Sequence, residues 1–137
     1  MSMGNKPIRI IIPLPPVTKK NSQRIIYAGG RPKVLPSEKY QEWENEAGYF
    51  LHGNQWKRIS EPVNVCCRFY MPTRRRVDLN NLLEAVTDML VRYGVVEDDN
   101  SRIVAGHDGS RVFYDKEHPR TVIEIWRLES CSDGKKQ

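Results

Sequence analysis

Residues 74–100 have the sequence RRRVDLNNLLEAVTDMLVRYGVVEDDN, and the helix predicted within them does most to define the fold. Apolar residues recur there every three or four positions, at Leu79, Leu82, Leu83, Val86, Leu90 and Tyr93. This spacing predicts an amphipathic helix with one narrow apolar stripe. Asp78 is placed to cap its start, and Gly94 is placed to end it in a left-handed conformation.

Two elements are predicted upstream of this helix. Residues 62–71, PVNVCCRFYM, place apolar side chains at every second position, which predicts a half-buried strand. Its inward residues are Val63, Val65, Cys67, Phe69 and Met71. Residues 38–51 are predicted to form a helix after an N-cap at Ser37, weakened by Gly48. Its inward face consists of Tyr40, Trp43, Ala47, Phe50 and Leu51.

The remaining segments predict strands. PIRIIIPLPP, residues 7–16, predicts a short buried strand ended by prolines. RIIYAGGRPKVLP, residues 24–36, predicts a hairpin that turns at two glycines, Gly29 and Gly30. RIVAGHDG and TVIEIWRL, residues 102–109 and 121–128, predict two further strands.

This order of elements predicts an α+β fold, in which a mixed sheet has two helices packed on one face. The length of 137 residues suits one domain, so we expect a single domain over 1–137. Residues 1–6 and about 130–137 are expected to be disordered tails.

The composition is that of an ordinary globular protein, with 39% hydrophobic and 28% charged residues. The longest apolar run, IRIII, is far shorter than the roughly 20 residues of a membrane span, and no signal peptide precedes it. We therefore expect a cytoplasmic protein without a membrane partner. The net charge of +5 is densest in the arginine run 74–76 and favours a polyanionic partner, but only weakly.

The cysteines and histidines predict no metal site. Cys66 and Cys67 are adjacent on a predicted strand, so one of them is expected to face the core. Cys131 lies in a polar tail, and no Cys-x-x-Cys pair is present. The three histidines, His52, His107 and His118, lack the spacing of zinc ligands, so a structural or incidental role is expected for each.

Oxygen-bearing side chains, by contrast, gather around the helix of residues 74–100. Asn80, Glu84 and Asp88 follow one another at intervals of four and form one polar row. Asp98 and Asp99 come after the helix, and they return near its start if the next strand pairs beside the strand of residues 62–71. Magnesium takes such oxygen ligands, and the ion relieves the repulsion between neighbouring carboxylates. Bound magnesium can activate water against a phosphodiester, with arginines holding the nucleic acid.

Each of these residues also has a simpler interpretation. Asp78 can be a plain helix cap, which does not exclude metal ligation. Glu84 and Asp88 can be solvated residues, residues 98–100 can form an ordinary turn, and an arginine run is more often solvated than bound. Only the combination favours a metal-dependent nuclease.

The sequence resembles the RusA-type Holliday junction resolvases of bacteria and their phages. The resemblance is carried by PLPPVTKKNS at 13–22, MPTRRRVDLNNLLEAVTDML at 71–90 and YGVVEDDNSRIV at 93–104. The family pattern is an arginine run, Asp-x-Asp-Asn, a lysine four residues after the second aspartate, a further aspartate, and a glycine-containing turn into Asp-Asp. The resemblance implies a RusA-like homodimer that cuts four-way DNA junctions by paired symmetric nicks, in recombination and repair. It implies magnesium, with manganese as a possible substitute, and no small-molecule cofactor, in a bacterial or phage-encoded protein.

The resemblance also implies roles for individual residues. The implied catalytic residues are Asp78 and Asp99, and we predict that Asn80 and Glu84, at the positions of the family's second aspartate and lysine, are catalytic as well. The implied metal ligands are Asp78, Asn80, Asp88, Asp98 and Asp99. The implied DNA-binding residues are Arg74, Arg75, Arg76, Lys19, Lys20, Asn21 and Asn81.

Two positions depart from the family pattern. Asn80 stands at the second aspartate, and Glu84 stands at the lysine. Our hypothesis is that Glu84 supplies the carboxylate missing at position 80, while the missing cation comes from residues 74–76, Lys19 or Lys20. The alternative is a catalytically impaired protein of the same fold that binds branched DNA. A third possibility is a nuclease with the same metal chemistry that acts on flaps or on RNA.

Overall fold

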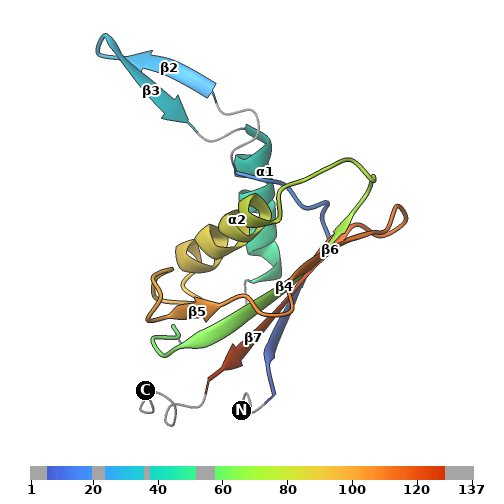
Figure 1. Ribbon diagram of the computed structural model, residues 1–137. Helices are drawn as coiled ribbons and strands as arrows, with labels where there is room; N and C mark the ends of the chain where they lie inside the picture. Colours follow the sequence, from blue (N-terminus) through green and yellow to red (C-terminus); the bar gives the residue numbers. More distant parts are fainter. Residues whose placement is uncertain (1–5, 20–23, 36–37, 52–57, 129–137) are drawn as a thin grey trace.

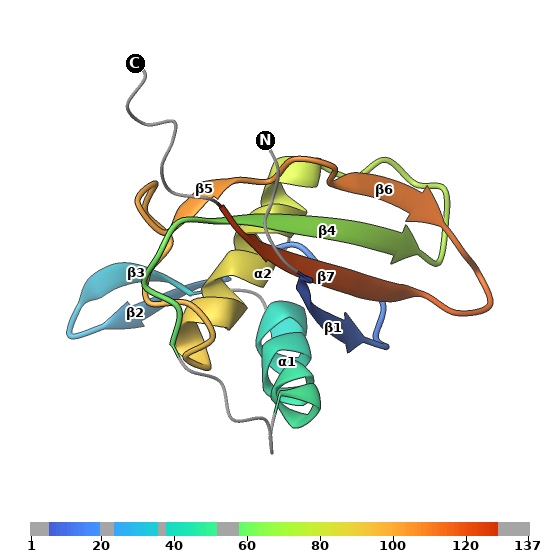
Figure 2. The same cartoon turned by 90° about the horizontal axis from the view of Figure 1, so that it is seen from below.

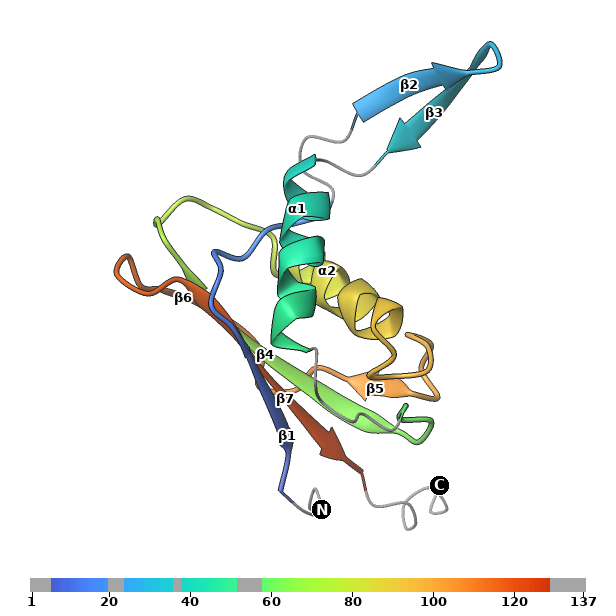
Figure 3. The same ribbon diagram turned by 180° about the vertical axis from the view of Figure 1, so that it is seen from behind.

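The computed structural model describes residues 6–19, 24–35, 38–51 and 58–128. A five-stranded mixed sheet forms one layer, and two α-helices form the second layer on one face of that sheet (Figure 1, Figure 2). A separate two-stranded hairpin stands away from both layers (Figure 3). The predicted α+β class and the placement of both helices on one face are confirmed.

The sheet is built around its longest strand, β4. The strands are β1 (Ile8–Ile12), β4 (Val63–Met71), β5 (Val104–Gly106), β6 (Arg111–Tyr114) and β7 (Arg120–Arg127). β7 lies between β1 and β4 and is antiparallel to both. β5 and β6 both pair with the other edge of β4, and both run parallel to it.

The helices close the core over this sheet. They are α1 (Glu38–Ala47), extended by a short 3-10 helix at Gly48–Phe50, and α2 (Leu79–Arg92). The core is made by side chains from both layers, including Ile12, Trp43, Phe69, Leu82, Met89, Leu90 and Ile123. Glu44 of α1 links the two helices, because its side chain accepts a hydrogen bond from Arg92 and its carbonyl accepts one from the Tyr93 hydroxyl. Within α1, the Glu44 side chain also accepts from the Tyr40 hydroxyl.

The predicted helical faces need small corrections. Leu79 and Tyr93 are only partly buried on α2, whereas Ala85 and Met89, which the apolar stripe omitted, are fully buried. Phe50 is 41% exposed because regular α-helix ends at Ala47, and the tighter 3-10 turn rotates the side chains that follow. Close packing requires a glycine at position 48, since a Cβ there would lie 2.6 Å from the Tyr93 ring.

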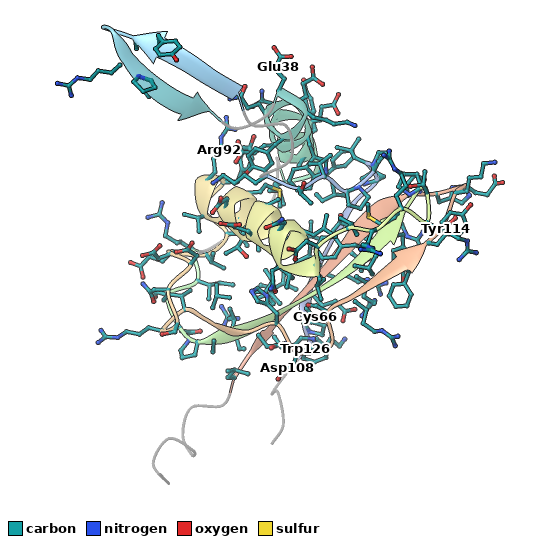
Figure 4. All side chains as sticks on the ribbon, turned by 45° about the horizontal axis from the view of Figure 1, so that its top comes forward. Glu38, Cys66, Arg92, Asp108, Tyr114 and Trp126 are labelled. Atoms are coloured by element: carbon teal, nitrogen blue, oxygen red, sulfur yellow. The ribbon has the colours of Figure 1, made fainter. Side chains whose placement is uncertain are left out.

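The strand at residues 62–71 is buried on both faces at its start, not on one. Val63, Val65, Cys67 and Phe69 face the helices as predicted, but Asn64 and Cys66 are buried as well. The chain between β5 and β6 covers them: the Asn64 amide exchanges two hydrogen bonds with the Asp108 backbone, at 2.8 and 3.1 Å. Figure 4 places Cys66, Asp108 and Trp126 close together on that side.

The predicted strand at 102–109 is also corrected. Only Val104–Gly106 is strand, because residues 107–110 leave the sheet in a turn that ends at Gly109, which has a φ of 89°. The four-residue β6 that follows was not predicted. The predicted burial of the strand within residues 7–16 is corrected too, since β1 is an edge strand whose Ile11 is 47% exposed. The predicted turns hold: Gly94 has a φ of 74° after α2, and Gly29 and Gly30 turn the hairpin with φ of 63° and 79°.

The hairpin consists of β2 (Arg24–Ala28) and β3 (Arg31–Leu35), paired antiparallel with Tyr27 opposite Pro32. Within the described part of the chain, no helix combines the length and apolar character that crossing a membrane requires. Apart from Lys6, the expected tails lie outside the described residues, as do the N-cap at Ser37, His52 and Cys131. The single-domain boundary stays a prediction.

Candidate active site

A pocket of about 360 Å³ lies along the polar side of α2, and we call it the acidic pocket. Three of its lining residues, Asn80, Glu84 and Asp88, are the predicted row on α2. Asp99 joins them from the turn after the helix. Its remaining lining residues are Leu83, Thr87, Val104 and His107. The sequence therefore predicted the four oxygen donors that the fold brings together.

The local sequence explains why these donors share one pocket. The Asp78 carboxylate accepts a hydrogen bond of 2.9 Å from the Asn80 amide, which fixes where α2 begins. The opposite side of α2 is buried in the core, so the polar row, whose members are four residues apart, must face outward. After Gly94, buried Val95 and Val96 hold the returning chain against the body. This return brings Asp99 alongside α2.

Lys19, which is far from α2 in the sequence, contacts one of the carboxylates of the acidic pocket. Lys19, in the segment after β1, forms an ion pair and a hydrogen bond with the Asp88 carboxylate. The hydrogen bond to Asp88 is the main reason that the pKa of Lys19 is raised, and the charges of Asp88 and Glu84 add to it. The ammonium also lies 5.9 Å from the centre of the Tyr40 ring. Lys19 thus neutralises part of the negative charge along the row.

His107 is the pocket residue that the sequence did not assign to the site. Its Nδ1 lies 2.9 Å from the carbonyl oxygen of Val65. Because a carbonyl can only accept, Nδ1 must carry the hydrogen, and the Nε2 of the neutral ring keeps its lone pair. His107 therefore places a nitrogen acceptor among the oxygen donors. The sequence placed His107 inside the strand predicted at 102–109 and offered no signal that its ring reaches the pocket.

The donor types in the acidic pocket fit a hard divalent cation. Three carboxylates and one amide oxygen line it, and magnesium prefers oxygen ligands. Among the described residues, however, no three acidic, histidine or cysteine side chains converge closely enough to hold an ion. The donors fit magnesium in kind, and their side chains would have to converge further to enclose it.

Three other predicted site residues lie outside the acidic pocket. Asp78 is exposed at the helix start and is engaged as the cap. Asp98 is exposed and turned into its own loop, where it accepts hydrogen bonds from the Asp99 backbone and the Asn100 side chain. The Asp99 backbone amide is the main reason that the pKa of Asp98 is lowered. Asn81, on α2, is half-buried and lines neither of the two pockets described here.

A second pocket, of about 390 Å³, lies by the segment that leads into α2, and we call it the basic pocket. Its charged residues are Lys39, Arg75 and Arg76, and the prolines and Val17 of the segment after β1 form part of its wall. Arg74 is directed elsewhere, with its guanidinium 4.1 Å from the centre of the Tyr114 ring. The predicted arginine run is therefore divided between a pocket and an aromatic contact. Lys20 and Asn21 lie outside the described residues.

The fold and the two pockets define a small α+β protein with oxygen donors along α2 and cationic side chains beside the segment that leads into it. The family model described as Endodeoxyribonuclease RusA matches residues 13–126. The chain therefore belongs to the RusA family, as its sequence motifs predicted.

A curated relative agrees with this family assignment. The chain is 32% identical over 87 residues to the crossover junction endodeoxyribonuclease RusA of Aquifex aeolicus (strain VF5). That match covers 62% of this chain and 66% of the relative, slightly less than two thirds of the relative's length.

Proposed function

We propose that this protein is a magnesium-dependent, structure-specific endodeoxyribonuclease. Its substrate is a four-way DNA junction, which it resolves by paired symmetric nicks during recombination and repair. The observation that carries this proposal is the acidic pocket, where α2 and the turn after it bring four oxygen donors together in a chain of the RusA family. The relative's name, crossover junction endodeoxyribonuclease, supports the same substrate.

The ligands proposed for magnesium are the donors of the acidic pocket. Glu84, Asp88 and Asp99 would provide charge, and Asn80 would provide a neutral oxygen. When bound, the ion polarises the phosphodiester and lowers the pKa of a bound water; manganese has similar ligand preferences and could substitute. The pairing of Lys19 with Asp88 supports Lys19 as the cation that replaces the lysine of the family pattern.

The chain's own residues would bind and orient the DNA. Lys39, Arg75 and Arg76 of the basic pocket can contact consecutive phosphates of a strand that approaches α2. His107 can accept a hydrogen bond at Nε2 from a water in the acidic pocket, because its Nδ1–H is held by Val65. Asp78 would act through α2, whose start it fixes beside Asn80.

The assembly proposed for this reaction is a homodimer. Two symmetric nicks in a junction with two-fold symmetry require two sites related by a two-fold axis, which one acidic pocket per chain supplies in a dimer. We further propose that it acts in the cytoplasm of a bacterium or of a phage-infected cell and needs no small-molecule cofactor.

The test is incubation of the full chain with a synthetic mobile four-way junction, with and without magnesium. A linear duplex of the same sequence serves as the substrate control. We expect paired nicks in opposite strands of the junction only when magnesium is present, and no nicking of the duplex. Equal cutting of both substrates would refute junction specificity, and cutting in the presence of a chelator would refute the metal requirement.

A second candidate is a branched-DNA-binding protein that does not cut. The observation that favours it is the ion pair of Asp88 with Lys19, together with the lack of a converged ligand set among the described residues. Calorimetric titration with magnesium separates the two functions. Junction binding without measurable magnesium binding or cleavage would establish this second candidate.

A further inference from the structure

Among the described residues, neither layer of the fold packs extensively against the β2–β3 hairpin. Its extensive contacts are those between its own two strands, and it projects from the body in Figures 1 and 3. All of its described side chains are exposed, and Tyr27 is 74% exposed. An isolated two-stranded hairpin is only marginally stable in water. A projecting hairpin of this kind is therefore expected to gain order from a partner.

The chemistry of the hairpin identifies that partner as a polyanion with flat apolar faces. Residues 24–35 contain three basic residues and no acidic residue. Arg31 and Lys33 lie on one face of the hairpin, since they are two positions apart on β3. Tyr27 and Pro32 are directly opposite each other and lie on the other face. Nucleic acid suits both faces, because phosphates attract the cations and bases stack on an aromatic ring.

The two ends of the hairpin are each a short link away from a residue at one of the two pockets. Lys19, which contacts Asp88 of the acidic pocket, is five residues before Arg24, a link of at most about 18 Å. Lys39, which lines the basic pocket, is four residues after Leu35, a link of at most about 14 Å. A strand of DNA that runs from the basic to the acidic pocket therefore passes close to the base of the hairpin.

We propose that the hairpin is a DNA-binding arm that contacts the branch point of a junction. The Tyr27–Pro32 face stacks on a base pair that is exposed where the arms separate, and Arg31 and Lys33 bind the flanking phosphates. A second copy of this chain is the less suitable partner, because two such hairpins would bring like charges together. This inference rests on the proposed function and adds a contact that selects branched over linear DNA.

The experiment measures the affinity of full-length variants for a four-way junction and for linear duplex, without metal, across a salt series. We expect Tyr27→Ala to bind the junction about tenfold more weakly and the duplex with almost unchanged affinity. A tenfold change is at the low end of the affinity lost when one base–aromatic stack is removed. Arg31→Ala combined with Lys33→Ala should reduce the slope of log affinity against log salt by about two. Tyr49→Ala is the matched control, because Tyr49 is 75% exposed but lies at the end of α1.

The outcomes separate this inference from the function on which it rests. If the wild-type protein neither binds nor cuts the junction, the proposed function fails. If it does so and the hairpin variants match it and Tyr49→Ala, only the hairpin inference is overturned. Light scattering is run on the same samples: hairpin variants that become monomeric while the wild type is dimeric would identify a second copy as the partner and overturn the DNA contact.

Discussion

The acidic and basic pockets are similar in size, at about 360 and 390 Å³, but they are built in different ways. The acidic pocket takes three of its donors from successive turns of α2, a helix whose other face is fixed in the core. The basic pocket takes its cations from the segment before α2 and from the first turns of α1. A reaction at a phosphorus atom requires catalytic groups at fixed distances from one another, whereas side chains that only bind the DNA backbone can adjust to the position of each phosphate. The comparison supports the proposal that the reaction takes place along α2 and that the segment before α2 binds the DNA backbone.

The largest effect is expected from Asp99→Asn. This change removes one negative charge from the acidic pocket at nearly constant volume, and the exposed position should leave folding unchanged. We expect junction cleavage to fall by at least about a hundredfold, comparable to the loss of one preorganised electrostatic group, with junction binding retained. Glu117→Gln, an exposed carboxylate in the turn before β7, is the control. Cleavage at the wild-type rate would remove Asp99 from the proposed ligand set.

The next effect concerns the replacement at positions 80 and 84. If Glu84 supplies the carboxylate that Asn80 lacks, Glu84→Gln should remove most metal-dependent cleavage. Combining Asn80→Asp with Glu84→Lys should restore part of it, because the two residues are one helical turn apart and line one pocket. Rates are measured on the same junction, with circular dichroism as a folding control. Near-wild-type cleavage by Glu84→Gln would falsify the compensation idea.

A moderate effect of a different kind is expected from the basic pocket. Replacing Arg75 and Arg76 together by alanine should weaken binding to junction and duplex alike, and should reduce the salt slope by about two. Cleavage at saturating protein should change little, since the acidic pocket is intact. Arg127→Ala is the control, because Arg127 pairs with Glu61 at the end of β7. A loss of cleavage at saturating protein would contradict the proposal that the basic pocket binds DNA without taking part in the reaction.

The smallest effect on stability is expected from Lys19→Met. The lost ion pair with Asp88 is partly exposed, so unfolding free energy should fall by less than about 1 kcal/mol, as measured by urea denaturation. Magnesium affinity, measured by calorimetry, should rise, because Asp88 becomes available to the ion. Lys116→Met, in the exposed turn after β6, is the control. Weaker magnesium binding would instead indicate that Lys19 holds Asp88 in position for the metal.

Local patterns were sufficient to predict most of the fold. The apolar stripe, Asp78 and Gly94 together defined α2, because helix periodicity and caps depend only on residues a few positions apart. Two glycines likewise defined the hairpin turn. β6 was missed because four residues with little burial carry too short a pattern. The second buried face of β4 was missed because its cover comes from residues more than forty positions later in the chain.

The candidate site likewise has residues that a local pattern predicted and residues that only the fold brings in. Asn80, Glu84 and Asp88 were predictable as a row on one helix, and Asp99 followed from the expected return of the chain beside β4. The Lys19–Asp88 pair joins residues 69 positions apart, and nothing local to either residue specifies that contact. His107 was excluded by an argument about zinc spacing, although it reaches the pocket through the fold. The features of the site that the sequence did not predict are therefore those that depend on contacts between residues far apart in the chain.

The number of residues between β5 and β6 differs from the number in the stretch of β4 that they flank. Three residues of β4 separate Asn64 from Arg68, whereas four residues, 107–110, separate their partners Gly106 and Arg111. The surplus residue forces the chain out of the sheet, and the excursion carries His107 to the carbonyl of Val65 and Ser110 to the amide of Cys67. Deleting one residue from 107–110 would let β5 and β6 merge into one uninterrupted strand. The length of this segment, together with its turn at Gly109, therefore keeps an imidazole at the edge of the acidic pocket.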